Sequence, residues 1–368
     1  MINNKLSRAT LSGFLILSAT LIFSTNSAFA GKTFDLGKDK SFTVGAGLRT
    51  SFGFREDAAA SGTDWTNDFD LESIRLYTSG QVYKNLFFEF NTEIVDGGDV
   101  NVIDGIAKLE LADPINIWLG RMLPPSDRAN LSGPYYQNMW DYPIVSQYPS
   151  LIYGRDDGIA VWGEVLDSKL KYQVGFYEGT PSTPTVNPED NPLFAGRVSF
   201  NILDGEPGYY NSSTYYGKKD IIALGFVLQS QADHVAQGGQ LGDFLGLNFD
   251  FLYEQKFGNG SVMDIEAALY LYDYDGVEPD SLGFMVVGSY LIPGKVGGYG
   301  QLMPKARLQV LDVDDMAGFT NNGASILDLQ LDYIMDGDNA RTSIILSHTN
   351  PEVRDSALAL KFGVQLQI

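Results

Sequence analysis

The sequence predicts an all-β fold, a transmembrane antiparallel β-barrel of about sixteen strands. Three observations predict it: an N-terminal secretory signal, a period-two alternation of apolar and polar residues, and connections that are alternately long and short. Strands that meet lipid on one side and water on the other alternate in this way. We therefore expect residues 31–368 to form one barrel domain, with a long third loop folded inward.

The first thirty residues are typical of a secretory signal peptide. Lys5 and Arg8 precede an apolar run, and the small-residue triplet Ala28-Phe29-Ala30 follows it. The apolar run is too short to cross a bilayer as a helix, which takes about 20 residues. We expect residues 1–30 to be removed and the mature chain to begin at Gly31.

Composition excludes several classes of function. The chain has no cysteine, which excludes disulfides, cysteine metal sites and a thiol nucleophile. Its formal charge is −21, and loss of Lys5 and Arg8 with the signal peptide would make it −23. Such a chain does not bind nucleic acid through a basic surface. We expect no cofactor and no metal.

Alternation recurs along the whole mature chain and supplies the strands. The first segment has Val44, Leu48 and Phe52 on one face and Arg49 and Ser51 on the other. Further apolar sets of one parity begin near residues 74, 86, 107, 115, 159, 170, 198, 222, 245, 265, 284, 306, 327, 344 and 358. A period of two indicates a strand between two different environments.

The connections favour a barrel over a soluble sandwich, because outer loops of such barrels are long and periplasmic turns are short. Long connections are expected at 56–69, 96–104, 122–157, 178–193, 230–242, 273–281, 312–324 and 349–355. Turns such as Tyr83-Lys84-Asn85 and Ala112-Asp113-Pro114 separate them. The stretch Leu203–Lys219 is too long for a turn on that side, and the sequence offers no reason for it.

The chain resembles the phosphate-selective porin O/P family. The resemblance rests on Leu71–Tyr77, on Tyr83–Phe90, on a long third loop after Leu119-Gly120-Arg121 and on the alternating C-terminus. It implies a sixteen-stranded homotrimeric porin in the outer membrane of a Gram-negative bacterium, in contact with lipid and lipopolysaccharide. It also implies passive diffusion of small hydrophilic solutes or ions, phosphate and other anions among them. The third loop departs from the family because it contains no lysine, and Ile368 replaces the usual terminal aromatic residue.

The inward loop, Leu123–Asp157, is expected to set the narrowest point of the pore. Its length, five prolines and six tyrosine or tryptophan residues favour a fixed path against the wall. The expected constriction residues are Arg121, Asp127, Arg128, Tyr135, Trp140 and Arg155, with Arg128 and Arg155 facing the solute. The expected pore-lining residues are Arg49, Arg75, Glu89, Glu93, Lys108, Glu110, Arg197, Asp264, Glu266, Lys305, Arg307 and Arg341.

Three alternatives remain open at this point. The third loop could stay outside as a lid or a subunit contact, and the inward charges could be wall ion pairs that stiffen the barrel. The barrel could instead be structural, or a sheath around a partner protein. An outer-membrane enzyme is the third alternative, but His234 and His348 are the only histidines and no Ser/His/Asp arrangement accompanies them.

Overall fold

The computed structural model describes residues 31–94 and 98–368. The predicted signal peptide lies outside these residues. The described chain forms one antiparallel sheet and one helix, α1 (Arg128–Tyr136). The strands are β1 (Lys32–Gly37), β2 (Lys40–Arg55), β3 (Thr66–Tyr83), β4 (Leu86–Ile94), β5 (Val100–Ala112), β6 (Ile115–Met122), β7 (Asp156–Val165), β8 (Leu170–Tyr177), β9 (Leu193–Asn201), β10 (Ile221–Gln237), β11 (Gln240–Lys256), β12 (Val262–Asp273), β13 (Ser281–Leu291), β14 (Gln301–Val313), β15 (Ala324–Asp336), β16 (Ala340–Pro351) and β17 (Ala357–Gln367).

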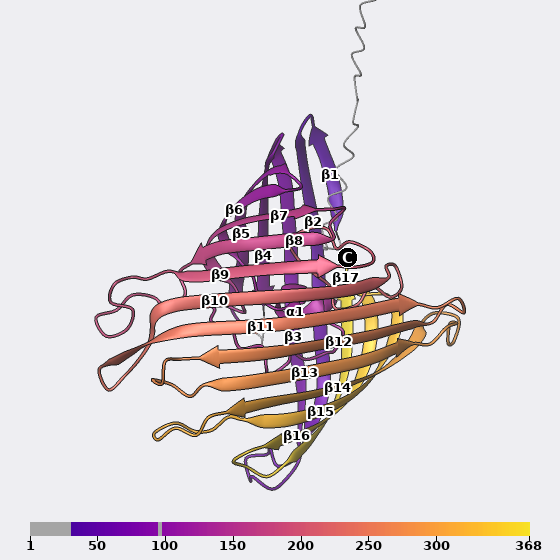
Figure 1. Cartoon of the computed structure of the whole chain (residues 1–368). Coiled ribbons are helices and arrows are strands. Elements are labelled where there is room, and N and C mark those ends of the chain that lie inside the picture. The colour runs from indigo at the N-terminus through magenta and orange to yellow at the C-terminus, as the bar shows by residue number, and fades with distance from the viewer. Residues whose placement is uncertain (1–30, 95–97) are drawn as a thin grey trace, which may run out of the picture.

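Strands β2 to β17 close into a sixteen-stranded barrel (Figure 1). Each pairs with the next in the chain, and β17 returns to β2, where Val364 lies opposite Thr50. This confirms the predicted closure, which leaves the barrel without an unpaired edge. The short β1 is additional: it pairs with the first residues of β2, beside the point where Ile368 exchanges two backbone hydrogen bonds with Ala46.

The predicted inward and outward faces are confirmed. Phe249 and Leu269 point outward and are about half exposed, whereas Asp250 and Glu266 point inward and are buried. Arg75 and Glu89, on the second and third strands of the barrel, also lie on the inner face. The outer face is therefore apolar and the inner face polar, because alternate side chains of a strand point to opposite sides.

Long and short connections separate the two ends of the barrel. We name the ends the loop end, which carries the connections after β2, β4 and β6, and the turn end, which carries the C-terminus. The expected loop at 230–242 is wrong. Strands β10 and β11 continue as a hairpin to a two-residue turn at Gly238-Gly239, whose φ angles of 59° and 87° suit a type I′ turn. The expected 96–104 loop falls partly on 95–97, outside the described residues.

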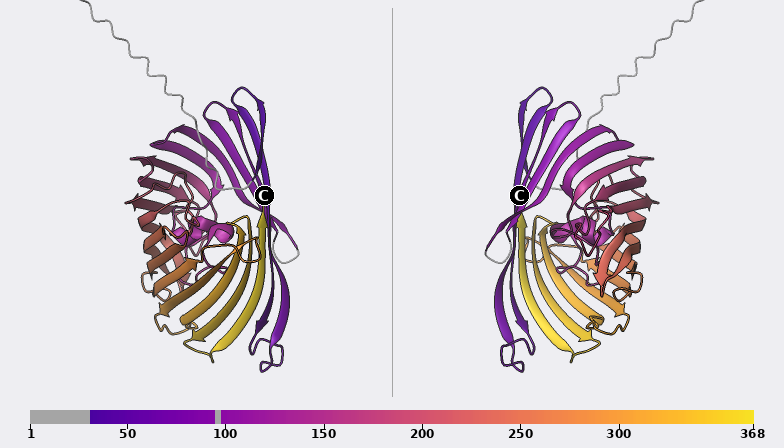
Figure 2. Two further views of the ribbon diagram at one scale, coloured as in Figure 1. Left: turned by 90° about the vertical axis from the view of Figure 1, so that its right-hand side faces the viewer. Right: turned by 90° about the vertical axis from the view of Figure 1, so that its left-hand side faces the viewer.

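The interior of the barrel is occupied. Figure 2 shows α1 inside the ring of strands. In the described residues, no helix is long and apolar enough to cross a bilayer.

Candidate pore constriction

The segment 123–155 runs into the barrel from the loop end, and we call it the loop-end insert. Asp127 caps α1 by accepting a hydrogen bond from the Asn130 N–H, which satisfies one of the free donors at a helix start. The helix is kinked at Gly133, whose φ of 62° is followed by Pro134. The kink turns the chain so that the next residues can follow the opposite wall.

Two aromatic rings of this insert seat against glycines of the wall. A Cβ placed on Gly47 would lie 2.7 Å from the Tyr135 ring, and one on Gly363 would lie 2.6 Å from the Trp140 ring. The Tyr135 hydroxyl is 2.9 Å from the Ser73 hydroxyl. The Trp140 carbonyl accepts a hydrogen bond of 2.6 Å from Arg49, whose guanidinium stacks over the indole. Both rings are therefore held in fixed positions.

The other side of the loop-end insert packs into an apolar cluster within the barrel. The insert contributes Leu123, Leu131, Met139 and Val145. The wall contributes inward residues of β6, β7 and β11 to β14, namely Trp118, Trp162, Phe244, Tyr270, Met285, Val287 and Leu311. Burial of apolar area of this kind is the main stabilising contribution available to a folded segment. The insert is therefore a packed part of the fold.

A second segment, residues 203–219, enters from the turn end, and we call it the turn-end insert. Its Tyr209 ring stacks on Trp118 at 4.6 Å between centroids, and its hydroxyl donates to the Leu123 carbonyl. Lys171 of β8 donates to the Gly208 carbonyl at 2.8 Å. The connection 203–219, whose length the sequence does not explain, therefore folds into the barrel and packs against its interior.

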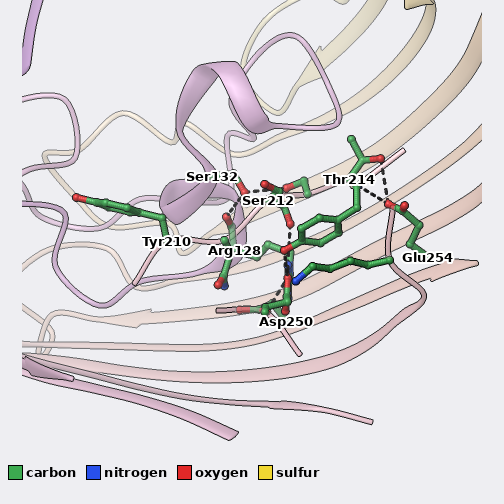
Figure 3. Close-up of polar contacts among 12 residues, drawn as sticks. Arg128, Ser132, Tyr210, Ser212, Thr214, Asp250 and Glu254 are labelled. Carbon is green, nitrogen blue, oxygen red and sulfur yellow. Dashed lines mark hydrogen bonds and ion pairs between the residues drawn. The ribbon is translucent and has the colours of Figure 1, made fainter. Parts of the chain in front are cut away.

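The two inserts meet at Arg128. Its guanidinium donates to both oxygens of Glu206, at 2.7 and 2.8 Å, and to the Ser212 carbonyl at 2.7 Å. Its Nε lies 3.9 Å from Asp250 on the wall. Figure 3 shows Arg128 below α1 with Asp250 and Glu254 on the wall strands beside it.

Most charged side chains in this interior form ion pairs, either between the two inserts, between an insert and the wall, or between strands of the wall. Burial would raise the pKa of the Glu206 carboxyl, but the Arg128 guanidinium lowers it to about 2. Burial raises the pKa of Asp127 to about 6, although Tyr270 and Ser146 donate hydrogen bonds to it. Further ion pairs are Arg75–Glu93, Lys108–Glu89, Arg155–Asp104, Arg197–Asp250, Lys305–Asp332, Arg307–Asp328 and Lys361–Asp141.

Together the inserts cover the inner wall. Every barrel strand has an inward residue that is no more than 6 % exposed. In order from β2 to β17 these include Arg49, Arg75, Glu93, Asp104, Trp118, Ala160, Gln173, Arg197, Gln229, Asp250, Glu266, Val287, Arg307, Gln330, Ser343 and Gln365. In a wide water-filled lumen these side chains would be exposed to solvent. In this conformation the inner face of every described barrel strand is therefore covered at one or more positions.

One expected constriction residue lies elsewhere. Arg121 belongs to β6 and shares the outward parity of Leu119, so its side chain is outside the barrel. There it forms a two-pronged ion pair with Asp157, its neighbour on β7, at 2.7 and 2.8 Å. The expectation that Arg121 supports the constriction is therefore wrong, because β6 continues to Met122 and the alternation continues with it.

Asp127, Arg128, Tyr135, Trp140 and Arg155 do lie in the loop-end insert inside the barrel. Arg128 and Arg155 do not face an open path, because both are buried and paired with carboxylates. The pore-lining residues expected from parity lie on the inner face, namely Arg49, Arg75, Glu89, Glu93, Lys108, Glu110, Arg197, Asp264, Glu266, Lys305, Arg307 and Arg341. Only Lys108 and Glu110 of these are more than marginally exposed.

The two histidines are separated. The His234 ring nitrogen Nδ1 is 2.9 Å from the Thr180 hydroxyl, near the loop end, whereas His348 is on the outward face of β16. Among the described residues, no group of three histidine or carboxylate side chains is placed to hold a metal ion.

Comparison with known proteins gives the fold. No protein-family model matches the chain, and no curated protein matches it. Solved structures do. The chain is similar to an anion-selective porin from Comamonas acidovorans (14 % identity, TM-score 0.61, covering 89 % of this chain and 100 % of that one). It is also similar to OmpT, an outer-membrane protein of Vibrio cholerae (13 %, 0.58, 92 % and 100 %), and to OmpF of Salmonella typhi (10 %, 0.58, 90 % and 98 %). The chain therefore has the porin barrel fold.

Proposed function

We propose that the protein is an outer-membrane porin, a channel for passive diffusion of small hydrophilic solutes and ions. The observation that carries the proposal is a closed sixteen-stranded barrel, apolar outside and polar inside, with a long connection folded within it. The outer face suits a lipid bilayer, and a barrel of this strand number encloses space for an aqueous path. The proposal places residues 1–30 as its signal peptide and the barrel in a Gram-negative outer membrane.

We infer a weak preference for cations over anions. The arginines offered for anion binding are neutralised: Arg128 pairs with Glu206 and Arg155 with Asp104. Acidic residues outnumber basic ones along the chain, whose formal charge is −21, and a negative field of this kind attracts cations to the mouths of a path. Phosphate selectivity, which the family resemblance suggested, has no comparable support in this arrangement.

Planar-bilayer recordings test this proposal. The reconstituted protein is placed between KCl solutions of different concentration, and the reversal potential is measured. We expect ohmic steps and a reversal potential of the sign that marks K⁺ as more permeant than Cl⁻. Replacement of chloride by phosphate should leave the potential nearly unchanged. A reversal potential of the opposite sign would overturn the cation preference, and the absence of any step from every folded variant would overturn the channel.

A homotrimer is part of the proposal. One of the solved barrels similar to this chain is described as a trimer form of Vibrio cholerae OmpT. Chemical crosslinking in lipid would reveal the oligomer. A second candidate is a structural barrel that does not conduct, which the packed interior cluster favours. The filled lumen gives no comparable support to a sheath around a partner protein, and the separated histidines give none to an enzyme.

A further inference from the structure

The two inserts differ in what holds them. The loop-end insert is fixed by aliphatic side chains buried in the interior cluster. From Asp204 to Lys219 the turn-end insert has no alanine, valine, leucine, isoleucine or methionine. Its Tyr209 and Tyr210 rings join the same interior cluster, and Tyr215 and Tyr216 pack against two smaller apolar clusters of the wall. Its other contacts are hydrogen bonds and the Arg128–Glu206 ion pair; a hydrogen bond contributes only about 1 kcal/mol net. The turn-end insert buries one apolar side chain in the interior cluster, whereas the loop-end insert buries four, so the turn-end insert is the less strongly held of the two.

The two ends of the turn-end insert are hydrogen-bonded to each other at Asp204 and Asp220, and we call this pair the neck. The Asp204 N–H donates to the Asp220 carbonyl at 3.0 Å, and the Asp220 N–H donates to the Asp204 carboxylate at 2.9 Å. The residues between them form a closed loop whose ends stay together. Gly208 and Gly217, with φ of 89° and 75°, supply backbone conformations that other residues rarely adopt. The loop can move as one unit while the neck and β9–β10 remain paired.

Contacts near its neck and farther along the loop join it to the loop-end insert. Glu206 accepts two hydrogen bonds from the Arg128 guanidinium and a third from the Tyr215 hydroxyl at 2.5 Å. The Ser213 N–H donates to the Tyr136 carbonyl at 3.1 Å. The Ser132 and Ser213 hydroxyls are also 3.1 Å apart. Figure 3 shows Ser132 and Ser212 at this junction.

We propose that the turn-end insert is a removable plug. Latched to α1 through Arg128–Glu206 and Ser132–Ser213, it closes the lumen. Withdrawal toward the turn end opens a path along the wall that it covers, past Trp118, Lys171 and Glu254. This inference rests on the proposed channel function and adds a closed resting state to it. The loop-end insert remains in place as the constriction of the open state.

A reversible crosslink tests the plug. Because the natural chain has no cysteine, Ser132→Cys with Ser213→Cys introduces one defined pair. Their hydroxyls are close enough for the replacing sulfurs to form a bond of about 2.0 Å. We expect the oxidised double variant to lose its conductance steps and to regain them on reduction with dithiothreitol. The matched control is Thr33→Cys with Thr43→Cys, whose hydroxyls are 2.8 Å apart at the rim, and whose disulfide should leave conductance unchanged.

A second variant removes the plug. Residues Gly205–Lys219 are replaced by Asn-Gly, a two-residue turn that suits the paired neck Asp204/Asp220. A folded plug-less barrel should show larger and more persistent steps than the natural protein, even if the natural protein is silent. If the reduced double-cysteine variant conducts, equal conductance after oxidation would overturn the plug, as would plug-less steps of natural size. If the reduced variant is silent, the plug-less barrel alone decides. If the folded plug-less barrel never conducts, the channel function itself fails.

Discussion

Arg128 and Glu206 form a two-pronged ion pair, 2.7 and 2.8 Å long, between segments that enter the barrel from opposite ends. The residues are 78 positions apart in the chain, and both are almost completely buried. Burial removes the hydration of both charged groups of an ion pair. The net free energy that the pair contributes to stability therefore depends on its geometry and on the other hydrogen-bond partners of each group. Here Asp250, Ser212 and Tyr215 supply them.

Removing one partner of this pair should cost much more than removing both. Glu206→Gln leaves the Arg128 charge without its carboxylate, and we expect the free energy of unfolding to fall by about 3 to 5 kcal/mol. Arg128→Met with Glu206→Gln should recover part of the loss. Urea unfolding of the refolded barrel in detergent provides the measurement. The control is Asp157→Asn, which breaks the exposed pair with Arg121 and should cost about 1 kcal/mol or less.

If the proposed function holds, the apolar outer face of the barrel contacts lipid and predicts a different sensitivity. Phe249 lies on the outward face of β11, near the middle of the strand, and is 45 % exposed. Phe249→Arg should lower the free energy of unfolding from lipid by about 2 to 4 kcal/mol, because a charge would face the bilayer midplane. Gln240→Arg, at the exposed start of the same strand, should be close to neutral. Equal losses measured in lipid vesicles at both positions would argue against a membrane around β11.

Glycines of the wall should matter where rings rest on them. Gly47→Ala forces the Tyr135 ring to move, since the added Cβ would lie 2.7 Å from it, and such overpacking costs about 1 to 3 kcal/mol. Gly53→Ala on the same strand meets only an ordinary contact of 3.6 Å and should be neutral or slightly stabilising. Thermal unfolding and near-ultraviolet circular dichroism report the difference. Identical shifts for both variants would mean that Tyr135 is not seated on Gly47.

Mild acid should stabilise the inserted state through Asp127. Its pKa is raised to about 6 by burial, so the folded state binds a proton that the unfolded chain, with a pKa of about 4, does not. Lowering the pH from 7 to 5 should therefore add about 1 kcal/mol to stability. Glu206 does not oppose this, because its pKa of about 2 keeps it charged throughout this range. The comparison is urea unfolding of the natural protein and of Asp127→Asn, whose gain on acidification should be smaller by this amount, since other carboxyls such as Asp338, with a pKa raised by burial to about 6, add their own share. An Asp127→Asn variant with the full increment would assign the effect to other carboxyls.

The faces of the strands were predictable because alternation is local. Arg75 and Glu93, for example, follow from counting within their own strands. The inward course of the loop-end insert was predictable from its length, prolines and aromatic rings. The turn-end insert was not, since its partners Lys171, Glu254 and Arg128 are distant in sequence and nothing near 203–219 marks them.

Two further differences have local causes. Arg121 is expected at the base of a loop, after the end of a strand. In the structure β6 continues to Met122, so Arg121 is a strand residue and its side chain points outward. The 230–242 stretch carries polar residues at both parities beyond the expected apolar band, so the hairpin there resembles a loop in sequence. The pairing of β10 with β11 up to Gln237 and Gln240 holds it as a ribbon.

The short β1 bears on how the barrel finds its alignment when it closes. It occupies the edge of β2 from Lys40 to Val44, while β17 occupies the same edge from Gly47 to Arg55. A slip of β17 by two residues would preserve every inward and outward side chain, so alternation alone does not forbid it. Toward the turn end such a slip would drive Ile368 into Lys32. β1 therefore blocks a shift of β17 toward the turn end and fixes the register in which β17 pairs with β2.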